Sequence, residues 1–167
     1  MTGRPGVGKT TLVEQVVKRL NVPVGGFYTR EIRERGRRVG FSLSTWEGQT
    51  GTLSHVEVES PFRVGKYGVN IQVVNDIGVP AIDEAVASGN LIVIDELGRM
   101  ELFSKKFQQV VLEALDSEVP LLGSIQERPH PFLDAIRNRP DVELIHITLE
   151  NRHDLVREIV RRLGGRG

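Results

Sequence analysis

The fold of this chain is decided by Gly3-Arg4-Pro5-Gly6-Val7-Gly8-Lys9-Thr10, which matches the pattern G-x-x-x-x-G-K-[S/T] at every position. Its glycines let the backbone wrap closely, so that backbone N–H groups converge on phosphate oxygens. Lys9 brings a positive charge to the β- and γ-phosphates of a nucleotide, and the Thr10 hydroxyl can ligate Mg²⁺. Apolar residues follow with helical spacing as far as Leu20. The motif therefore predicts a phosphate-binding loop that opens a helix, with the positive end of the helix facing the phosphates.

The second motif is a short apolar run, residues 91–94, that ends in Asp95 and Glu96. Such a run is typical of a parallel strand buried on both faces, and it delivers both acids at the carboxyl end of the strand, beside the P-loop. We predict that Asp95 holds Mg²⁺, mostly through the water ligands that this ion keeps. Glu96 is predicted to orient and polarise the water that attacks the γ-phosphate.

Gly98 and Arg99 follow the acidic pair. A glycine here allows the chain to turn sharply, which would keep Arg99 near the γ-phosphate. A guanidinium presents several donors in one plane to the charge that spreads over the phosphoryl oxygens in the transition state. The alternative is a structural ion pair of Arg99 with Glu101 or Asp95 that only shapes the loop.

These motifs together define the predicted site. The predicted nucleotide-binding residues are Gly3, Arg4, Pro5, Gly6, Val7, Gly8, Lys9, Thr10, Thr11, Asp95, Glu96, Gly98 and Arg99. Within this set, Lys9, Glu96 and Arg99 are predicted to be catalytic, and Thr10 and Asp95 to hold Mg²⁺, the one cofactor that the sequence implies.

Several other polar residues are weaker candidates. Ser124 lies at the end of a predicted strand and would either sense the γ-phosphate or be satisfied by the backbone. Three arginines, Arg137, Arg139 and Arg152, would either line the base or phosphate side of the site or lie at helix ends on the surface. Five more crowd one predicted hairpin: Arg30, Arg33, Arg35, Arg37 and Arg38. They would grip phosphates or RNA, but the interleaved acids favour a solvated hairpin tip.

The rest of the chain predicts one α/β P-loop domain over residues 1–167. β-rich runs at 27–33, 39–46 and 52–58, separated by glycine-containing turns, predict an antiparallel hairpin or meander inserted at about 27–58, with mostly loop at 59–76. From Pro80 onward, helices and strands alternate: helices at 80–89, from Ser104, at 130–137 and at 151–163, and strands at 91–94, 120–125 and 142–147. This alternation predicts a mostly parallel central sheet covered by helices on both faces. Only Met1 and Thr2 precede the loop, so the first strand is expected to be a stub or to have lost residues.

Composition limits the class of partner. Lys and Arg number 22 and Asp and Glu number 22, so no overall field recruits nucleic acid or a membrane surface. The chain has no cysteine and no apolar run long enough to span a membrane, which suits a cytoplasmic protein. We therefore expect nucleoside triphosphates as partners, no membrane, and no dominant nucleic-acid contact. The sequence does not set the oligomeric state.

The second motif also carries a family resemblance. Asp95-Glu96-Leu97-Gly98-Arg99-Met100-Glu101-Leu102 closely resembles the D-E-I-G-K-M-E-L signature of a small P-loop nucleoside-triphosphatase family of thermophilic bacteria, archaea and animals, which includes a human cancer-related member. Further similar segments are 26–31, 40–41, 63–67, 136–139 and 150–152. The resemblance implies Mg²⁺-dependent hydrolysis of ATP, GTP, CTP and UTP to the diphosphate and phosphate, on an α/β P-loop fold with an added catalytic glutamate. Arg99 departs from the signature, which has lysine at that position.

Two other functions remain open from the sequence. A nucleoside or nucleotide kinase shares the P-loop but must position an acceptor hydroxyl, whereas the adjacency of Asp95 and Glu96 favours water as the nucleophile. A nucleotide-switched ATPase subunit of a nucleic-acid machine would turn over negligibly without its partner.

Overall fold

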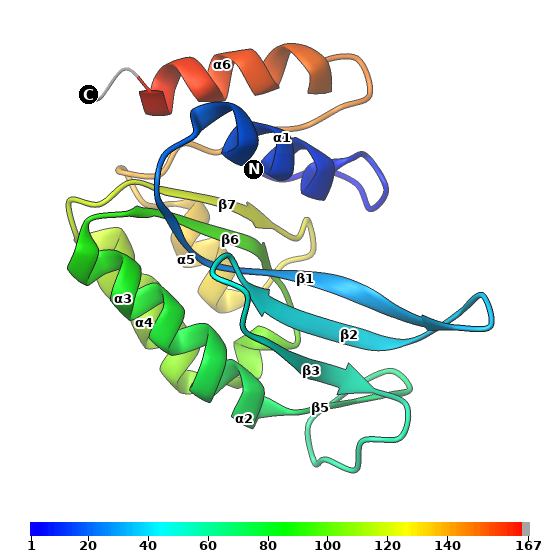
Figure 1. The fold of residues 1–167 in the computed structure, drawn as a ribbon. Coiled ribbons are helices and arrows are strands. Elements are labelled where there is room, and N and C mark those ends of the chain that lie inside the picture. Colours follow the sequence, from blue (N-terminus) through cyan, green and yellow to red (C-terminus); the bar gives the residue numbers. More distant parts are fainter. Residues whose placement is uncertain (165–167) are drawn as a thin grey trace.

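The computed structural model describes residues 1–164, which form an α/β structure around one mixed sheet (Figure 1). The strands lie in the order β4-β5-β3-β2-β1-β6-β7. Their bounds are β1 Val24–Glu34, β2 Arg37–Thr45, β3 Thr50–His55, β4 Arg63–Val64, β5 Tyr67–Val69, β6 Leu91–Leu97 and β7 Leu121–Ile125. The helices are α1 Lys9–Leu20, α2 Ile71–Val73, the π-helix η1 Val74–Gly78, α3 Val79–Ser88, the 3₁₀ turn η2 Glu101–Phe103, α4 Lys105–Asp116, α5 Pro131–Arg137 and α6 Arg152–Gly164.

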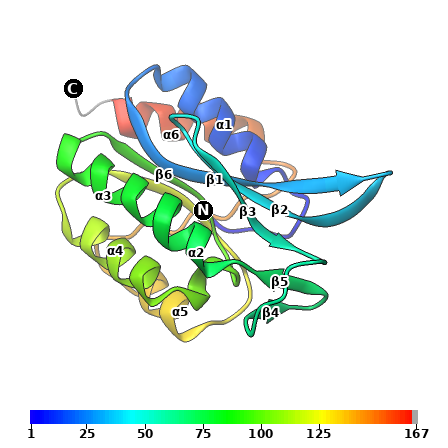
Figure 2. The same ribbon diagram turned by 60° about the horizontal axis from the view of Figure 1, so that its bottom comes forward.

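The parallel strands β1, β6 and β7 position the acidic pair. Figure 2 shows α1 and α6 on one face of the sheet and α3, α4 and α5 on the other. Leu91 and Val93 pack in the apolar cluster under α1 and α6, whereas Ile92 and Ile94 pack in the cluster under α3 and α4. The run before Asp95 is thus buried on both faces, as predicted, and this fixes the direction in which its carboxyl end points.

The insertion after α1 is antiparallel, as predicted. β1 pairs with β2 and β2 with β3, and the hairpin turn is made by Arg35 and Gly36, both with positive φ. Residues 59–76, which the sequence predicts as mostly loop, also contain β4, β5, α2 and the start of η1. β5 pairs with β3, so this segment extends the same sheet. The α/β fold is confirmed, and its sheet is mixed: the strands β1, β6 and β7 pair parallel with one another, whereas β2, β3, β4 and β5 join antiparallel.

The segment before the P-loop lies beside β7. The Met1 ammonium donates to the Gly123 carbonyl (2.7 Å), and the Ile125 N–H donates to the Met1 carbonyl (2.8 Å). On the other side, Thr2 pairs with His146 in a single parallel bridge. β7 therefore separates the P-loop segment from β6. This arrangement determines which side chains can reach Asp95.

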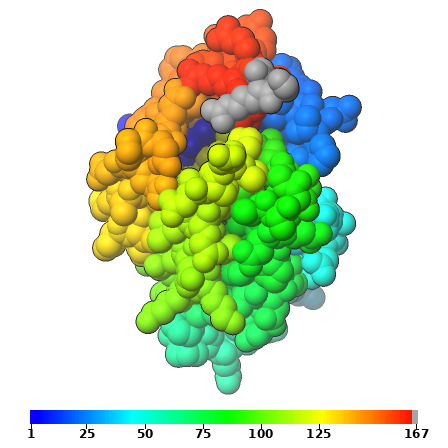
Figure 3. Space-filling view, turned by 90° about the vertical axis from the view of Figure 1, so that its left-hand side faces the viewer, coloured from blue at the N-terminus to red at the C-terminus, as the bar shows by residue number. Residues whose placement is uncertain are grey.

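The predicted strand at 142–147 is wrong, because only the bridge at His146 forms there. His146 pairs with Thr2. Leu144 and the residues before it face a cavity of about 520 Å³ instead of another strand. Leu121 and Leu163 line the other sides of this cavity. Figure 3 shows it as a hollow below α6, with the dark blue N-terminal residues at its bottom.

The helix boundaries follow local signals in the sequence. Ser104 caps α4 as predicted, because its Oγ accepts the Phe107 N–H (3.0 Å). Gly89 ends α3 in the left-handed conformation, with φ 69°. Among residues 1–164, no helix is long and apolar enough to cross a membrane.

Candidate functional site

The P-loop turns tightly and leads directly into α1. Gly6 and Gly8 have φ of 81° and 103°, a region that side chains disfavour. A Cβ on Gly3 would lie 2.8 Å from the Ile147 carbonyl oxygen, so this position also excludes a side chain. The predicted residues Arg4, Pro5 and Thr11 are exposed, and Val7 is buried beneath the loop. The loop therefore has the conformation that the sequence motif requires.

Lys9 connects the P-loop to the acidic pair. Its Nζ donates to the Gly3 carbonyl oxygen (3.1 Å) and lies 3.6 Å from Oε2 of Glu96. The Lys9 side chain is only 10% exposed. The structure thus brings together two motifs that lie far apart in the sequence, as the prediction for this site required.

Of the two acids Asp95 and Glu96, Asp95 is the more buried. It is 2% exposed, and its Oδ1 accepts a hydrogen bond from the Ser124 hydroxyl (2.9 Å). Burial raises the pKa of Asp95, and hydrogen bonds from Ser124 and Thr10 oppose that rise. Asp95 and Thr10, the two predicted magnesium ligands, are therefore neighbours.

The donor chemistry at this point suits Mg²⁺. A carboxylate and a hydroxyl are hard oxygen ligands, and Mg²⁺ is usually held by one or two protein oxygens, with water and phosphate completing its shell. A bound cation would also favour the ionised form of the buried Asp95 carboxyl. Within residues 1–164, no group of three or more His, Cys, Asp or Glu residues could form an all-protein metal cage.

Glu96 faces the open side of the site. Its side chain is 35% exposed and lines a cavity of about 620 Å³ together with Thr10 and Asp95. Burial raises the pKa of Glu96, and the positive charge of Lys9 lowers it. A partly enclosed carboxylate beside an open cavity can orient a water molecule there.

The turn after Glu96 is held by a buried carboxyl. Glu101 is 4% exposed, and its Oε2 accepts the Gly98 N–H (3.1 Å). Burial raises the pKa of Glu101 to about 8, and the negative charge of Glu96 adds to the rise. Glu101 is a site residue that the sequence reasoning considered only as a partner for Arg99. The signal that could have identified it is an acid directly before an apolar pair, at the start of a helical turn.

Arg99 is exposed and lines the cavity. The alternative ion pair with Glu101 or Asp95 does not form, because those acids bond to Gly98 and Ser124 instead. Opposite Arg99, the cavity wall is made by residues of the antiparallel strands, namely Thr29, Arg30, Glu31, Arg33, Phe41, Leu53 and Val64. The insertion therefore contributes directly to the site.

The family model described as NTPase matches residues 1–160. This chain belongs to the NTPase family. Among relatives, nucleoside-triphosphatase THEP1 of Thermotoga sp. (strain RQ2) is 45% identical over 160 residues, covering 96% of this chain and 91% of the relative. The cancer-related nucleoside-triphosphatase of Homo sapiens is 42% identical over 176 residues, covering 96% and 93%. The crystal structure of THEP1 from Aquifex aeolicus is similar with a TM-score of 0.87 at 40% identity, covering 95% of this chain and 94% of that one.

Ser124 has a role in this NTPase-family chain that the sequence did not predict. It is fully buried, and its hydroxyl donates to Asp95 (2.9 Å), so of the two alternatives a hydroxyl satisfied by the backbone is wrong. The serine therefore orients a predicted metal ligand from the neighbouring strand.

Of the three weaker arginine candidates, two are tied to the fold. Arg137 pairs with Asp134 (2.6 Å), and Arg139 pairs with Asp116 and Asp141 (2.7 Å each). Arg152 differs, because its Nη1 donates to the Val7 carbonyl in the P-loop (3.4 Å).

Three of the five hairpin arginines are paired with acids, two of them with an acid of the hairpin itself. Arg30 pairs with Glu14 of α1, and Arg33 and Arg38 both pair with Glu31 (2.9 and 3.3 Å). The hairpin tip projects beyond the body of the molecule in Figure 1. These contacts agree with a solvated tip and leave the paired arginines little charge for a polyanion.

Proposed function

We propose that this NTPase-family protein is a nucleoside-triphosphatase that hydrolyses nucleoside 5′-triphosphates to the diphosphate and phosphate, with Mg²⁺ as cofactor. The observation that carries the proposal is the 3.6 Å approach of Lys9, from the P-loop, to Glu96, next to Asp95. Thr10, Asp95 and Glu96 line one cavity, and the Lys9 ammonium lies beside Glu96, so a cation, a hydroxyl and two carboxylates are close to one another. Nucleotide hydrolysis needs this combination.

Each residue has a defined role in this proposal. P-loop N–H groups and Lys9 bind the β- and γ-phosphates, and Thr10 with Asp95 would hold Mg²⁺, which neutralises charge on the phosphates. Ser124 keeps the Asp95 carboxylate in place through its hydrogen bond. Glu96 orients a water molecule that enters through the open cavity and accepts its proton.

Lys9 couples binding to the basicity of Glu96. In the structure the ammonium lowers the pKa of the Glu96 carboxyl. A bound γ-phosphate attracts the same ammonium and so weakens its effect on Glu96. Glu96 therefore becomes a stronger base when the substrate is in place.

Arg99 is proposed to stabilise the charge that develops on the phosphoryl oxygens. It lines the cavity that holds Glu96 and is exposed to any ligand there. Its planar donors can meet the equatorial oxygens of the transferring group.

We propose broad base specificity, with ATP, GTP, CTP and UTP all as substrates. The P-loop contacts only phosphates, and the sequence has no Asn-Lys-x-Asp segment that would read guanine. Without groups that pair with base edges, discrimination depends on stacking and shape.

The test is a phosphate-release assay with each of the four triphosphates, with Mg²⁺ and with EDTA. We expect release from all four without any acceptor, loss of release in EDTA, and loss of turnover and weaker nucleotide binding in Lys9→Ala. Strict dependence on a nucleoside acceptor would indicate a kinase, and negligible turnover that rises with DNA or RNA would indicate a machine subunit. A preference of about a thousandfold for one base, roughly 4 kcal/mol, would contradict broad specificity.

A further inference from the structure

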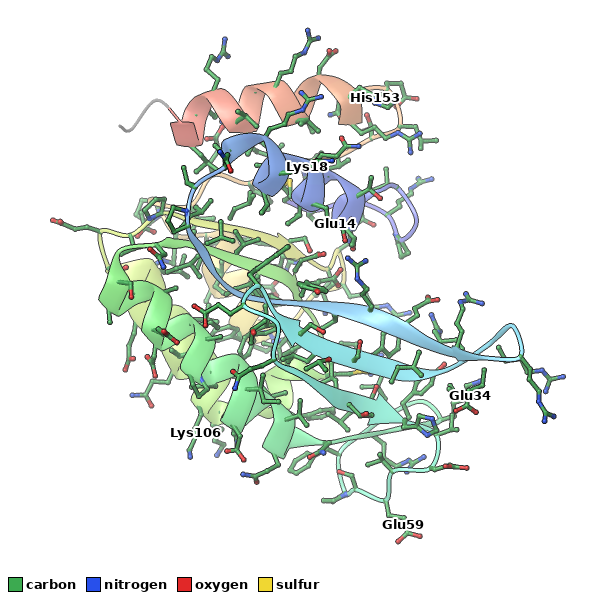
Figure 4. The ribbon with its side chains drawn as sticks, viewed as in Figure 1. Glu14, Lys18, Glu34, Glu59, Lys106 and His153 are labelled. Atoms are coloured by element: carbon green, nitrogen blue, oxygen red, sulfur yellow. The ribbon has the colours of Figure 1, made fainter. Side chains whose placement is uncertain are left out.

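Arg152 lies against the P-loop although it comes from the last helix. Its Nη1 donates to the Val7 carbonyl oxygen at 3.4 Å, a long contact. A Cβ on Gly8 would lie 3.7 Å from that Nη1 and 3.9 Å from the Arg152 Cδ. Figure 4 labels the next residue, His153, at this end of α6. The guanidinium is therefore a neighbour of two predicted phosphate-binding residues.

The donors of this guanidinium are poorly satisfied. Its Nε is buried and has no hydrogen-bond partner among the described residues. Two other arginines of α6, by contrast, have acidic partners. Arg157 contacts Asp154 (2.8 Å), and Arg162 contacts Glu143 and Glu158. No acid of residues 1–164 lies within 4 Å of Arg152. A buried N–H without an acceptor is costly, so the fold alone does not explain this side chain.

The position of Arg152 in α6 is also unfavourable for a cation. It is the first residue of the helix, where the N–H groups carry partial positive charge. That end of a helix favours acids, as Asp154 in the same turn illustrates. The buried Nε is closed to a ligand, but an anion bound beside the P-loop would supply the opposite charge and acceptors for the Nη groups.

The direction of the substrate follows from Lys9 and Glu96. These residues mark the γ-phosphate end of the site, because Glu96 must reach the attacking water. Figure 1 shows the start of α6 on the other side of the P-loop from β6. Arg152 is therefore closer to the end of the polyphosphate that carries the nucleoside.

We propose that Arg152 is a substrate-binding residue whose guanidinium binds the polyphosphate of the nucleotide on the side of the P-loop opposite Glu96, towards the α-phosphate. This inference rests on the proposed function, because it assumes a triphosphate in the P-loop. Phosphate offers the paired acceptors that a guanidinium fits, and it is common to all four triphosphates. Arg152 thus adds affinity without adding base specificity.

The test compares Arg152→Ala with Arg157→Ala, which removes an exposed arginine of the same helix. Calorimetry measures the Kd of ATP and of inorganic tripolyphosphate, which has the phosphates but no nucleoside. A charge-assisted contact predicts that Arg152→Ala raises both Kd values about 10- to 100-fold. The loss should appear in KM and kcat/KM, with a smaller change in kcat, because the contact forms in ground and transition states alike. Arg152→Lys should recover part of the affinity, and Arg157→Ala should bind like the wild type.

Three results would overturn the proposal. Unchanged Kd values for both ligands would exclude a contact, and weaker ATP binding with unchanged tripolyphosphate binding would place Arg152 on the nucleoside. A fall in the melting temperature of nucleotide-free Arg152→Ala and Arg152→Lys alike, with unchanged Kd, would make it a structural tether. If wild-type protein failed to bind or hydrolyse ATP, the proposed function itself would fail, which is a distinct outcome.

Discussion

Glu101→Gln is expected to remove a pH dependence of stability that the wild-type protein has. The Glu101 carboxyl is buried, and burial raises its pKa from 4.5 to about 8. Between these pH values the unfolded chain releases the proton and the folded chain keeps it, so the folded state binds more protons. By linkage, stability falls as pH rises through this window. At about 1.4 kcal/mol for each pH unit, the full loss is about 5 kcal/mol, nearly all of it complete above pH 8.

Glutamine keeps the size of the side chain and an oxygen that can accept the Gly98 N–H, but it does not ionise. The free energy of unfolding of wild type and variant should therefore differ in pH dependence, with the variant gaining up to about 5 kcal/mol relative to wild type between pH 4.5 and pH 9. Urea unfolding of the nucleotide-free proteins at several pH values, followed by circular dichroism, measures this. Glu118→Gln, which changes an exposed acid, is the matched control and should follow the wild type. Parallel curves for wild type and Glu101→Gln would refute the reasoning, because the buried carboxyl would then titrate alike in both states.

Two further predictions concern catalysis. Glu96→Gln should lower kcat about a hundredfold to ten-thousandfold while ATP and Mg²⁺ still bind, because the amide cannot accept a proton. Asp95→Asn should first weaken Mg²⁺ binding, and excess Mg²⁺ should partly rescue its activity. Steady-state kinetics across Mg²⁺ concentrations separates the two roles, and an identical Mg²⁺ dependence in both variants would contradict the assignment. Arg99→Ala should lower kcat by about a hundredfold with little change in the Kd of ATP, and Arg99→Lys should recover much of it. A lower melting temperature with intact kcat would instead assign Arg99 to the scaffold.

The parts of the site that can be predicted from the sequence are those where the local backbone conformation or burial restricts the residue type. The P-loop requires glycine where φ is positive, as at Gly6 and Gly8, and so its pattern is visible in eight consecutive residues. The buried strand before Asp95 is similarly visible, because burial on both faces leaves a continuous apolar run. In both cases one short segment carries the whole signal.

The insertion was predicted only in outline. Its first three strands are β-rich runs separated by glycine turns, and their antiparallel pairing is confirmed. β4 and β5 are two and three residues long, too short for a periodic pattern. β5 pairs with β3 and β4 pairs with β5, so their place in the sheet depends on tertiary contacts. For the same reason the sequence did not predict that Phe41 and Leu53 would form a wall of the cavity that Glu96 lines.

Strand order explains why Ser124 and Glu101 were not identified in their actual roles. Ser124 can reach Asp95 because β7 lies between the P-loop segment and β6, and nothing local to residues 121–125 specifies that neighbour. Glu101 reaches the Gly98 N–H because the chain folds back within one turn and buries the carboxyl under the loop. Both residues act on the site through another residue, and so their chemistry depends on the fold that surrounds them. Residues that contact the phosphates can be recognised from a motif, whereas the residues that orient them require the assembled sheet.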